Sequence, residues 1–414
     1  MSLPPVAAAF EFDQGVDVKD ALNSAPQSAP EPGDLSVQAA PSGRAKWTVM
    51  YFINGKNNLV SYVDPDLNHM EEVGSTDRLK ILSEIGKSGE SVKRRRMEWD
   101  DQPQTVTSPV AVDLGASDMG DWKTLAAFGK WAKANYPAEH YLLSIWNHGS
   151  GWLQQRPRGD GEWSTSGISY DDETGHHIKT TELAQALAAM GGVDVYASDA
   201  CLMQMAEVSY ELRNVAKVVV GSEDNEPAVG WNYARYLGPL ARNPQMSPQQ
   251  VGQAYVTAFQ DSYALLGLTT TVSSLNAETF RRFIPLINAW TVEMFEADEK
   301  ELVRTARRDV QSYSDSDNVD LVDFVERIGA GTRRASVRRA GQRLTDFVRR
   351  RLVTSNASTG ERVAGSTGLA IYLPTGSFNE DYAQLAWARD STWPNFARWV
   401  SHVMSETPTP KLKS

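Results

Sequence analysis

Residues 193–203 read VDVYASDACLM and contain Cys201, the single cysteine in a chain of 414 residues. The first part of this stretch favours a strand and the residues after it favour a helix, so Cys201 is expected at a strand-to-helix junction. A second junction, YLLSIWNHGSGW at 141–152, ends on His148 and glycines. Open α/β sheets place their sites at the carboxyl ends of strands. The two junctions therefore predict a cysteine nucleophile and its histidine at one edge of an α/β sheet.

Apolar runs of strand length alternate with amphipathic stretches along much of the chain. This alternation predicts a mainly parallel sheet covered by helices. Thr180 or Thr181 is the expected N-cap of one of these helices. We expect strands at 47–54, 79–85, 141–147, 193–198, 216–223 and 268–275, and helices at 59–74, 122–137, 180–190 and 202–212.

Composition divides the chain into four parts. Residues 1–45 are rich in Ala, Pro, Ser and Gly, which predicts a disordered or loosely attached extension. Residues 46–240 carry the alternation of strands and helices and form the expected core with the site. Residues 241–405 are helix-rich and are expected to add late strands to the same sheet. Residues 406–414 form a tail.

The formal net charge is −11, from 41 basic and 52 acidic residues. This acidic balance argues against a sequence-independent surface for nucleic acid. No uncharged stretch approaches the roughly 18 apolar residues of a membrane span, and the amino terminus does not read as a secretory signal. A single cysteine allows no internal disulfide, which is typical of a reducing compartment. We therefore expect a cytoplasmic protein without nucleic-acid or membrane partners.

Several segments together resemble one known family. His148 precedes Cys201 by 53 residues, close to the roughly 50 that separate this pair in caspase-type enzymes. YLLSIWNHGSGW, GISYDDETG and DACLM, in this order, resemble the clostripain (C11) family of cysteine peptidases, which are relatives of caspases. The resemblance is clear over 47–235, and STGLAIYLP at 366–374 resembles the family's late strand. It implies a caspase-like core, a mainly parallel sheet sandwiched by helices, and an endopeptidase that requires no cofactor.

Peptide hydrolysis through Cys201 needs a thiolate, an imidazole and donors for the oxyanion. His148 is the expected base, and a position at the start of a helix would favour the thiolate of Cys201. The backbone N–H groups of Gly149 and Cys201 are the expected oxyanion donors. The alternatives are a buried cysteine that only packs and a core histidine with satisfied hydrogen bonds.

Asp199 lies two residues before Cys201 and, in an extended strand, points to the same side. A carboxylate there raises the pKa of the thiol, and a basic P1 side chain of a substrate would give it a reason to be present. The resemblance implies that an aspartate at this position forms the base of the S1 pocket and selects arginine or lysine. The alternative is that Asp199 caps the helix after Cys201.

Basic residues mark two candidate processing segments. The resemblance to caspase-like enzymes implies a zymogen that is cleaved between the histidine and the cysteine, where the polar loop at 152–167 contains Arg156 and Arg158. Arg158 is the preferred site, because Arg156 precedes a proline. The alternative is an ordinary charged loop. The run from Lys93 to Arg96 is either another processing site or, as we favour, a strand edge with solvated arginines.

The stretch SYDDETGHH at 169–177 clusters carboxylates, so calcium is a candidate ion there, although a solvated hairpin explains the same residues. The predicted function is a cysteine endopeptidase that cleaves proteins after exposed arginine, or lysine, once it or an upstream protease has cut its zymogen loop. Analogy with bacterial caspase-like proteins suggests a switched effector in defence or cell death. The alternative is a catalytically silent scaffold that binds partners.

Overall fold

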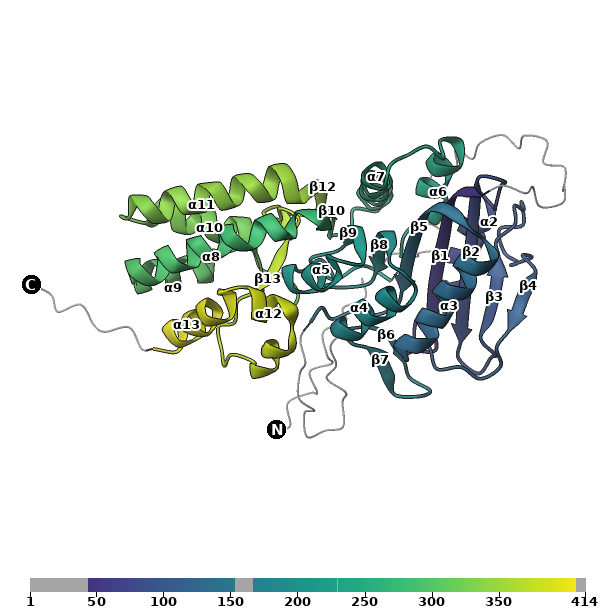
Figure 1. Ribbon diagram of the computed structural model, residues 1–414, viewed down its shortest axis with the longest axis horizontal. Coiled ribbons are helices and arrows are strands. Elements are labelled where there is room, and N and C mark those ends of the chain that lie inside the picture. Colours follow the sequence, from purple (N-terminus) through teal and green to yellow (C-terminus); the bar gives the residue numbers. More distant parts are fainter. Residues whose placement is uncertain (1–43, 153–166, 229, 407–414) are drawn as a thin grey trace, which may run out of the picture.

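The computed structural model describes residues 44–152, 167–228 and 230–406 (Figure 1). Three predictions fall outside the described residues: the extension up to residue 43, the processing residues Arg156 and Arg158, and the tail over 407–414. No helix within the described ranges is both long and apolar enough to cross a membrane.

One nine-stranded sheet runs through the molecule, and its middle is parallel (Figure 1). The five central strands, in the order β9-β8-β5-β1-β2, all run in the same direction. Antiparallel strands extend the sheet at both ends, with β10 and β12 beyond β9 and β3 and β4 beyond β2. The predicted mainly parallel sheet is confirmed. Its strands are β1 (Ala45–Gly55), β2 (Leu79–Lys87), β3 (Lys93–Arg96), β4 (Val110–Asp113), β5 (Ala138–Trp146), β8 (Val193–Asp199), β9 (Ala216–Gly221), β10 (Thr270–Asn276) and β12 (Val353–Thr359).

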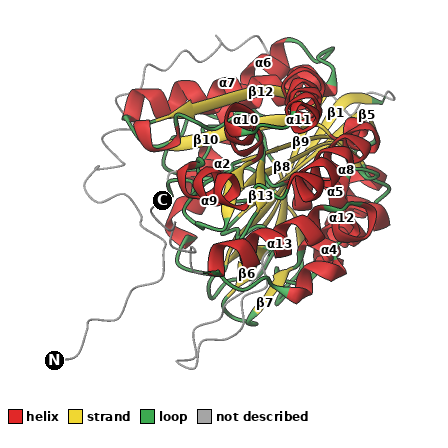
Figure 2. Ribbon diagram, turned by 90° about the vertical axis from the view of Figure 1, so that its left-hand side faces the viewer, coloured by secondary structure: helices red, strands yellow, loops and turns green. Residues whose placement is uncertain are grey.

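Helices cover both faces of this sheet, because its central strands are apolar on both sides (Figure 2). Along β1, Met50 and Phe52 join the core beneath α3, α4 and α5, whereas Val49 and Tyr51 join the core beneath α2, α6 and α7. This alternation is the two-residue period of a strand. The covering helices are α2 (Val63–Glu71), α3 (Trp122–Asn135), α4 (Thr180–Ala189), α5 (Ala206–Leu212), α6 (Tyr233–Arg242) and α7 (Pro248–Leu266).

The helix-rich part that follows α7 lies beyond the β12 end of the sheet (Figure 1). Its chain also supplies β10 and β12 to the main sheet. The segment 366–374 contains a strand, β13 (Ala370–Tyr372), which pairs with β11 (Asn318–Asp320) in a separate two-stranded sheet. The helices here are α8 (Phe280–Ala297), α9 (Lys300–Asp309), α10 (Leu321–Gly331), α11 (Ala335–Phe347), α12 (Ala386–Asp390) and α13 (Trp393–Ser405).

The basic run from Lys93 to Arg96 forms β3, but β3 is not an edge strand, because β4 lies outside it. Arg94 is buried, and its Nε donates to Glu84 Oε2 at 2.5 Å. Its guanidinium also lies 5.0 Å from the ring centroid of Trp131. The prediction of solvated arginines is therefore wrong for Arg94, which forms an internal ion pair and would be costly to leave unpaired.

The helix α4 has a different N-cap from the one predicted. Lys179 is the N-cap residue, and its backbone N–H donates to Glu182 Oε2 at 3.0 Å. The Thr180 hydroxyl donates instead to the carbonyl of Gly151 at 3.1 Å. The prediction of Thr180 or Thr181 as the cap is wrong, because Thr180 is used to tie α4 to the chain that follows His148.

Candidate active site

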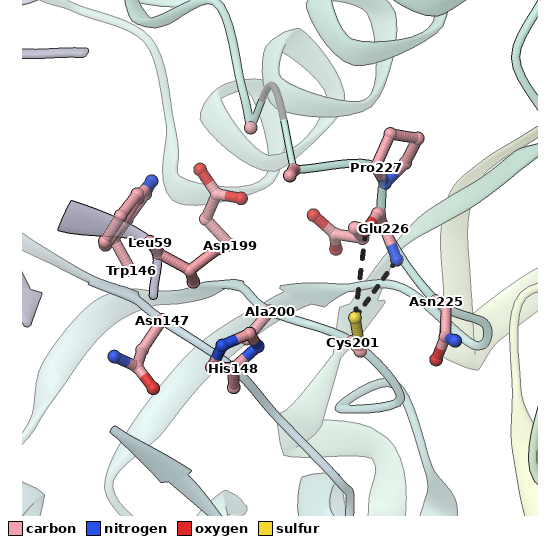
Figure 3. A pocket seen from close by; sticks show the side chains of 12 residues that line it. Leu59, Trp146, Asn147, His148, Asp199, Ala200, Cys201, Asn225, Glu226 and Pro227 are labelled. Atoms are coloured by element: carbon pink, nitrogen blue, oxygen red, sulfur yellow. Dashed lines mark hydrogen bonds between the residues drawn. The ribbon is translucent and has the colours of Figure 1, made fainter. Parts of the chain in front are cut away.

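The carboxyl ends of β5 and β8 open into a pocket with an empty volume of about 480 Å³ (Figure 3). The two strands are paired neighbours, with Trp146 opposite Asp199. His148 follows β5 and Cys201 follows β8, so adjacent strand ends bring the two side chains together with Asp199. The pocket is lined by Leu59, Trp146, Asn147, His148, Asp199, Ala200, Cys201, Asn225, Glu226, Pro227, Ala228 and Gly230.

Hydrogen bonds from two asparagine side chains link the ends of the strands near His148. Asn147 Nδ2 donates to the carbonyl of Asn54 at 2.5 Å, and Asn147 Oδ1 accepts the N–H of Tyr170 at 2.7 Å. Asn54 Nδ2 also donates to the carbonyl of Tyr170 at 3.0 Å. These bonds join the ends of β1 and β5 to β6 (Ile168–Asp171). The backbone that carries His148 is thereby held in one place.

The imidazole of His148 is positioned by Asn58, which sequence reasoning did not single out. His148 Nε2 lies 2.6 Å from Asn58 Oδ1. An amide oxygen only accepts hydrogen bonds, so in the neutral imidazole the proton sits on Nε2 and the lone pair on Nδ1. Burial lowers the pKa of His148 to about 4, which keeps the ring neutral at physiological pH. The neutral ring of His148 can therefore accept a proton at Nδ1.

Cys201 lies in a turn, and the prediction that it starts a helix is wrong. The helix α5 begins at Ala206. Cys201 is 8% exposed. The Cys201 thiol accepts the N–H of Glu226 at 3.3 Å and donates to the Glu226 carbonyl at 3.8 Å (Figure 3). Burial raises the pKa of the thiol to about 12. Without a helix terminus to favour the thiolate, the resting pair is a neutral thiol beside a neutral imidazole.

Gly149 packs directly against the backbone of Cys201. A Cβ atom on Gly149 would lie 2.5 Å from the carbonyl oxygen of Cys201 and 3.0 Å from the Cβ of Ala200, so no side chain fits there. Among the turn and loop hydrogen bonds of the described residues, none uses the N–H of Gly149 or of Cys201. Neither predicted oxyanion donor therefore has a main-chain partner among these bonds.

Asp199 is 5% exposed and ends β8. Its Oδ2 accepts the N–H of Trp231 at 3.2 Å and the hydroxyl of Tyr233. Burial and then the charge of Asp66 raise the pKa of Asp199 to about 7, although hydrogen bonds from Tyr233 and Trp231 and with Glu226 oppose the shift. The helix-cap alternative is wrong, because the N-cap of α5 is Met205.

Sequence reasoning missed two acidic neighbours of Asp199. Glu226 follows β9 and lines the pocket between Asp199 and Cys201 (Figure 3). Its Oε2 accepts the indole N–H of Trp231 at 2.7 Å. Asp66 comes from α2, far away along the chain. The only available signal for Glu226 was its place within the segment SEDNEPAVGWNY, to which no role had been assigned.

Two of the three carboxylates of the 169–177 hairpin, Asp171 and Glu173, are engaged by protein donors. Asp171 accepts the N–H groups of Met119, Glu173 and Thr174. Lys56 Nζ lies 2.9 Å from Glu173 Oε2. Within the part of the chain that the structure describes, no group of three or more His, Cys, Asp or Glu side chains is arranged to hold a metal ion. The hairpin consists of β6 and β7 (His176–Ile178).

A cysteine and a histidine at the ends of neighbouring parallel strands, in a sheet covered by helices on both faces, define the caspase-like class of α/β folds. A model of the clostripain family (C11 peptidases) matches residues 51–401, which is most of the chain. The chain therefore belongs to the clostripain family.

Individual relatives are more distant. Clostripain of Hathewaya histolytica is 28% identical over 193 residues, covering 41% of this chain and 36% of that protein, so the match spans about a third of its length. A secreted C11 cysteine protease from Bacteroides thetaiotaomicron, solved with an irreversible peptide inhibitor, has a TM-score of 0.62 at 21% identity and covers 86% of this chain and 99% of its own. An inactive zymogen C11 protease from Parabacteroides distasonis has a TM-score of 0.64 at 21% identity, covering 84% and 98%. These two structures share the fold.

Proposed function

We propose that the chain is a cysteine endopeptidase that cleaves proteins after arginine and, less readily, after lysine. The observation that carries this proposal is the shared pocket of Cys201, His148 and Asp199. The first two side chains can form and break an acyl-enzyme, and the third is a buried carboxylate suited to a cation. Membership of a peptidase family supports the same reaction class.

In the proposed reaction, His148 takes the proton from the Cys201 thiol as the sulfur attacks the substrate carbonyl carbon. The oxyanion of the tetrahedral intermediate is stabilised by the N–H groups of Gly149 and Cys201. The C–N bond then breaks as His148 gives its proton to the leaving amine, which leaves a thioester on Cys201. Water, deprotonated by His148, hydrolyses that thioester and restores the thiol.

The high pKa of the thiol is compatible with this scheme. A thiol with a pKa of about 12 beside an imidazole with a pKa of about 4 does not form a stable ion pair at neutral pH. Proton transfer must therefore accompany substrate binding, when the substrate displaces the main-chain contacts that Glu226 makes with the sulfur. This requirement would keep the free enzyme weakly reactive towards other electrophiles.

We further propose that the chain is a zymogen, activated by cleavage in the 152–167 loop after Arg158 or Arg156 by itself or by an upstream protease. The protonated, covered thiol supports a restrained resting state. The proposed reaction needs no cofactor, because the chain supplies the nucleophile, the base and the oxyanion donors. Calcium is a candidate structural ion, and adding a chelator to the activity assay tests whether the enzyme depends on it.

The cellular setting is part of the same proposal. We propose a cytoplasmic location, because the chain has one cysteine and forms no internal disulfide. A protease that cuts after any exposed arginine would damage its own cell, which suggests a switched effector in defence or cell death. That role rests on analogy, and subcellular fractionation followed by immunoblotting tests the location.

A panel of fluorogenic peptides that differ only at P1 tests the reaction and its specificity. Arginine, lysine, citrulline and norleucine at P1 separate charge from shape, because citrulline is a neutral analogue of arginine. Cleavage after arginine and lysine alone supports the proposal. Preference for norleucine or citrulline would contradict basic specificity, and no cleavage by the processed chain would favour the silent scaffold.

The kcat/KM for an arginyl peptide is expected to fall about tenfold per pH unit below pH 7 and to level off above it. Only the ionised form of Asp199 attracts a cation, and its raised pKa of about 7 means that protonation removes that form as the pH falls. The pKa of His148, about 4, places its own titration outside this range. Stopped-flow or plate-reader kinetics from pH 5 to 9 measure the profile.

Alkylation of Cys201 by iodoacetamide is the control for this profile, because the uncharged reagent does not use Asp199. Its rate should keep rising with pH through 7 to 9, since the pKa of the thiol is about 12. If both the alkylation rate and kcat/KM level off above pH 7, the ionisation near pH 7 belongs to the Cys201 and His148 pair and not to Asp199.

Asn58→Ala is expected to lower kcat by about 10- to 100-fold with little change in KM. The substitution removes the acceptor that fixes the His148 tautomer at 2.6 Å, and a hydrogen bond to a group that becomes charged during the reaction is worth about 1.5–3 kcal/mol. Asn58→Asp keeps an acceptor oxygen and should retain more of kcat. An unchanged kcat in Asn58→Ala would show that His148 does not need this partner.

A further inference from the structure

An acidic residue behind the pocket wall has no part in the mechanism above. Asp66 is 1% exposed, and among the described residues its Oδ2 finds no hydrogen bond of normal geometry. Burial holds the pKa of Asp66 well above its usual range, and the indole of Trp146 offsets this only in part. Burying a carboxyl group without partners destabilises a fold. The presence of Asp66 therefore calls for a ligand or a structural partner.

Gly230 connects Asp66 with the pocket. It lines the pocket and has a φ of +63°, a conformation in which a side chain would be strained. A Cβ atom at this position would lie 3.3 Å from Asp66 Oδ2, 3.4 Å from Asp199 Oδ2 and 3.4 Å from Trp146 Nε1. Oxygens of two carboxyl groups thus face the space that Gly230 leaves open.

No lysine or arginine in the described part of the chain forms an ion pair within 4.0 Å of Asp66 or Asp199. The basic group closest to Asp66 in that part is His69, whose Nδ1 lies 3.6 Å from Asp66 Oδ1. Burial lowers the pKa of His69, so its ring supplies no charge. Within the described residues, no charged basic side chain therefore neutralises the two carboxyl groups.

A buried carboxylate with a purely structural role looks different on the same helix. Glu71 also lies on α2 and is 1% exposed, but its Oε1 accepts the backbone N–H groups of Thr107 at 3.1 Å and Ser108 at 2.6 Å. Asp66 Oδ2 accepts no backbone N–H within the described residues, and only the indole of Trp146 lowers the pKa of Asp66. The contrast favours a ligand-binding role for Asp66.

We infer that Asp66 is a second carboxylate of the S1 pocket and that it distinguishes arginine from lysine. This inference rests on the proposed function and extends it. A guanidinium is planar and carries five N–H donors, so it can bridge Asp199 and Asp66 across the space beside Gly230. The ammonium of lysine is compact and sits on a shorter side chain, so it pairs with one carboxylate, Asp199.

Asp66→Asn tests this inference, because it removes the charge and keeps the shape. The substitution is expected to lower kcat/KM for an arginyl peptide by about 10- to 100-fold and for the matched lysyl peptide by less than about threefold. The control is Asp64→Asn, the same chemical change on the same helix at an exposed residue paired with Lys87, which should leave the arginine-to-lysine ratio unchanged.

Equal losses on both peptides, or no loss, would overturn the role of Asp66 while leaving basic specificity intact. If the wild-type chain cleaves neither peptide after processing, the proposed function fails instead. Asp66→Glu provides a second variant, because its longer side chain brings the carboxylate towards the shorter lysine. It should shift the ratio towards lysine by at least about fivefold, and an unchanged or more arginine-selective ratio overturns the inference.

A measurement on the wild-type protein covers the case in which neither variant folds. Benzamidine presents a planar pair of nitrogen donors, whereas benzylamine presents one ammonium. As competitive inhibitors of the processed enzyme, benzamidine should bind at least about tenfold more tightly, because it can contact both carboxylates. Equal inhibition constants would overturn a two-carboxylate pocket.

Discussion

Cys201→Ala is expected to abolish peptide cleavage, with a loss in kcat of at least about 10,000-fold. The substitution removes the only sulfur nucleophile in the chain, and His148 alone cannot form a thioester. Because Cys201 is small and lies in a turn, the alanine variant should keep the wild-type melting temperature within a few degrees. Fluorogenic arginyl peptides and a thermal melt measure the two properties.

Intact mass spectrometry of the two proteins separates self-processing from activation by another protease. Fragments that end at Arg156 or Arg158 in the wild type, with an intact Cys201→Ala chain, would show self-cleavage. Two intact chains would indicate an upstream protease or a silent scaffold. His177→Ala, outside the pocket lining, is a control that should process as the wild type does. Arginyl-peptide turnover by Cys201→Ala at the wild-type rate would refute the assigned nucleophile.

Asp199→Asn is expected to lower kcat/KM for arginyl and lysyl peptides by about 100- to 1,000-fold. The change removes a carboxylate that lines the pocket and weakens the pairing of the substrate cation, a loss worth about 2–5 kcal/mol. An asparagine still offers an oxygen to Trp231 and Tyr233, so the wall of the pocket should persist.

The ratio of arginyl to citrullinyl turnover isolates the charge effect in this variant. The wild type should strongly prefer arginine, and Asp199→Asn should lower the ratio by at least about tenfold. Alkylation of Cys201 by iodoacetamide should proceed at least as fast in the variant as in the wild type, because the nearby negative charge opposes thiolate formation. A ratio unchanged from that of the wild type would mean that Asp199 does not hold the P1 side chain.

The sequence was sufficient for those parts of the site that lie on continuous strand ends. Asp199 ends β8 and Cys201 follows it by two residues, while His148 follows the neighbouring strand β5, so a local pattern and the parallel topology place all three. The central sheet could be predicted for the same reason, since strands buried on both faces read as apolar runs. Both predictions use only local sequence patterns and the parallel order of the strands, and they need no knowledge of tertiary contacts between side chains.

Other features of the site and the fold depend on tertiary contacts that no local sequence pattern predicts. Leu202 adopts a left-handed conformation with φ of 61°, which delays the helix after Cys201 until Ala206 and removes the expected effect of a helix terminus. Asp66 and Asn58 reach the site from a helix and a loop near the amino terminus. Arg94 was expected in solvent because its neighbours are basic, but the β3 and β4 hairpin buries it against Glu84. In each case, tertiary packing overrode the local sequence signal.

The pairing of β5 with β8 has a consequence for the product of any cut between Trp152 and Gly167. The described residues on either side of the cut would stay together, because Ser150 N donates to the Gly167 carbonyl at 3.0 Å and Trp152 packs against Tyr372. One fragment would carry His148 and the strands β1 to β5, and the other would carry Cys201 and the strands β8, β9, β10 and β12, so that the two halves of the sheet meet where β5 pairs with β8. Such a nicked molecule would be a heterodimer of sister fragments, and exchanging halves with a neighbour would require breaking the β5–β8 pairing in the buried centre of the sheet, so each activated particle would descend from one precursor.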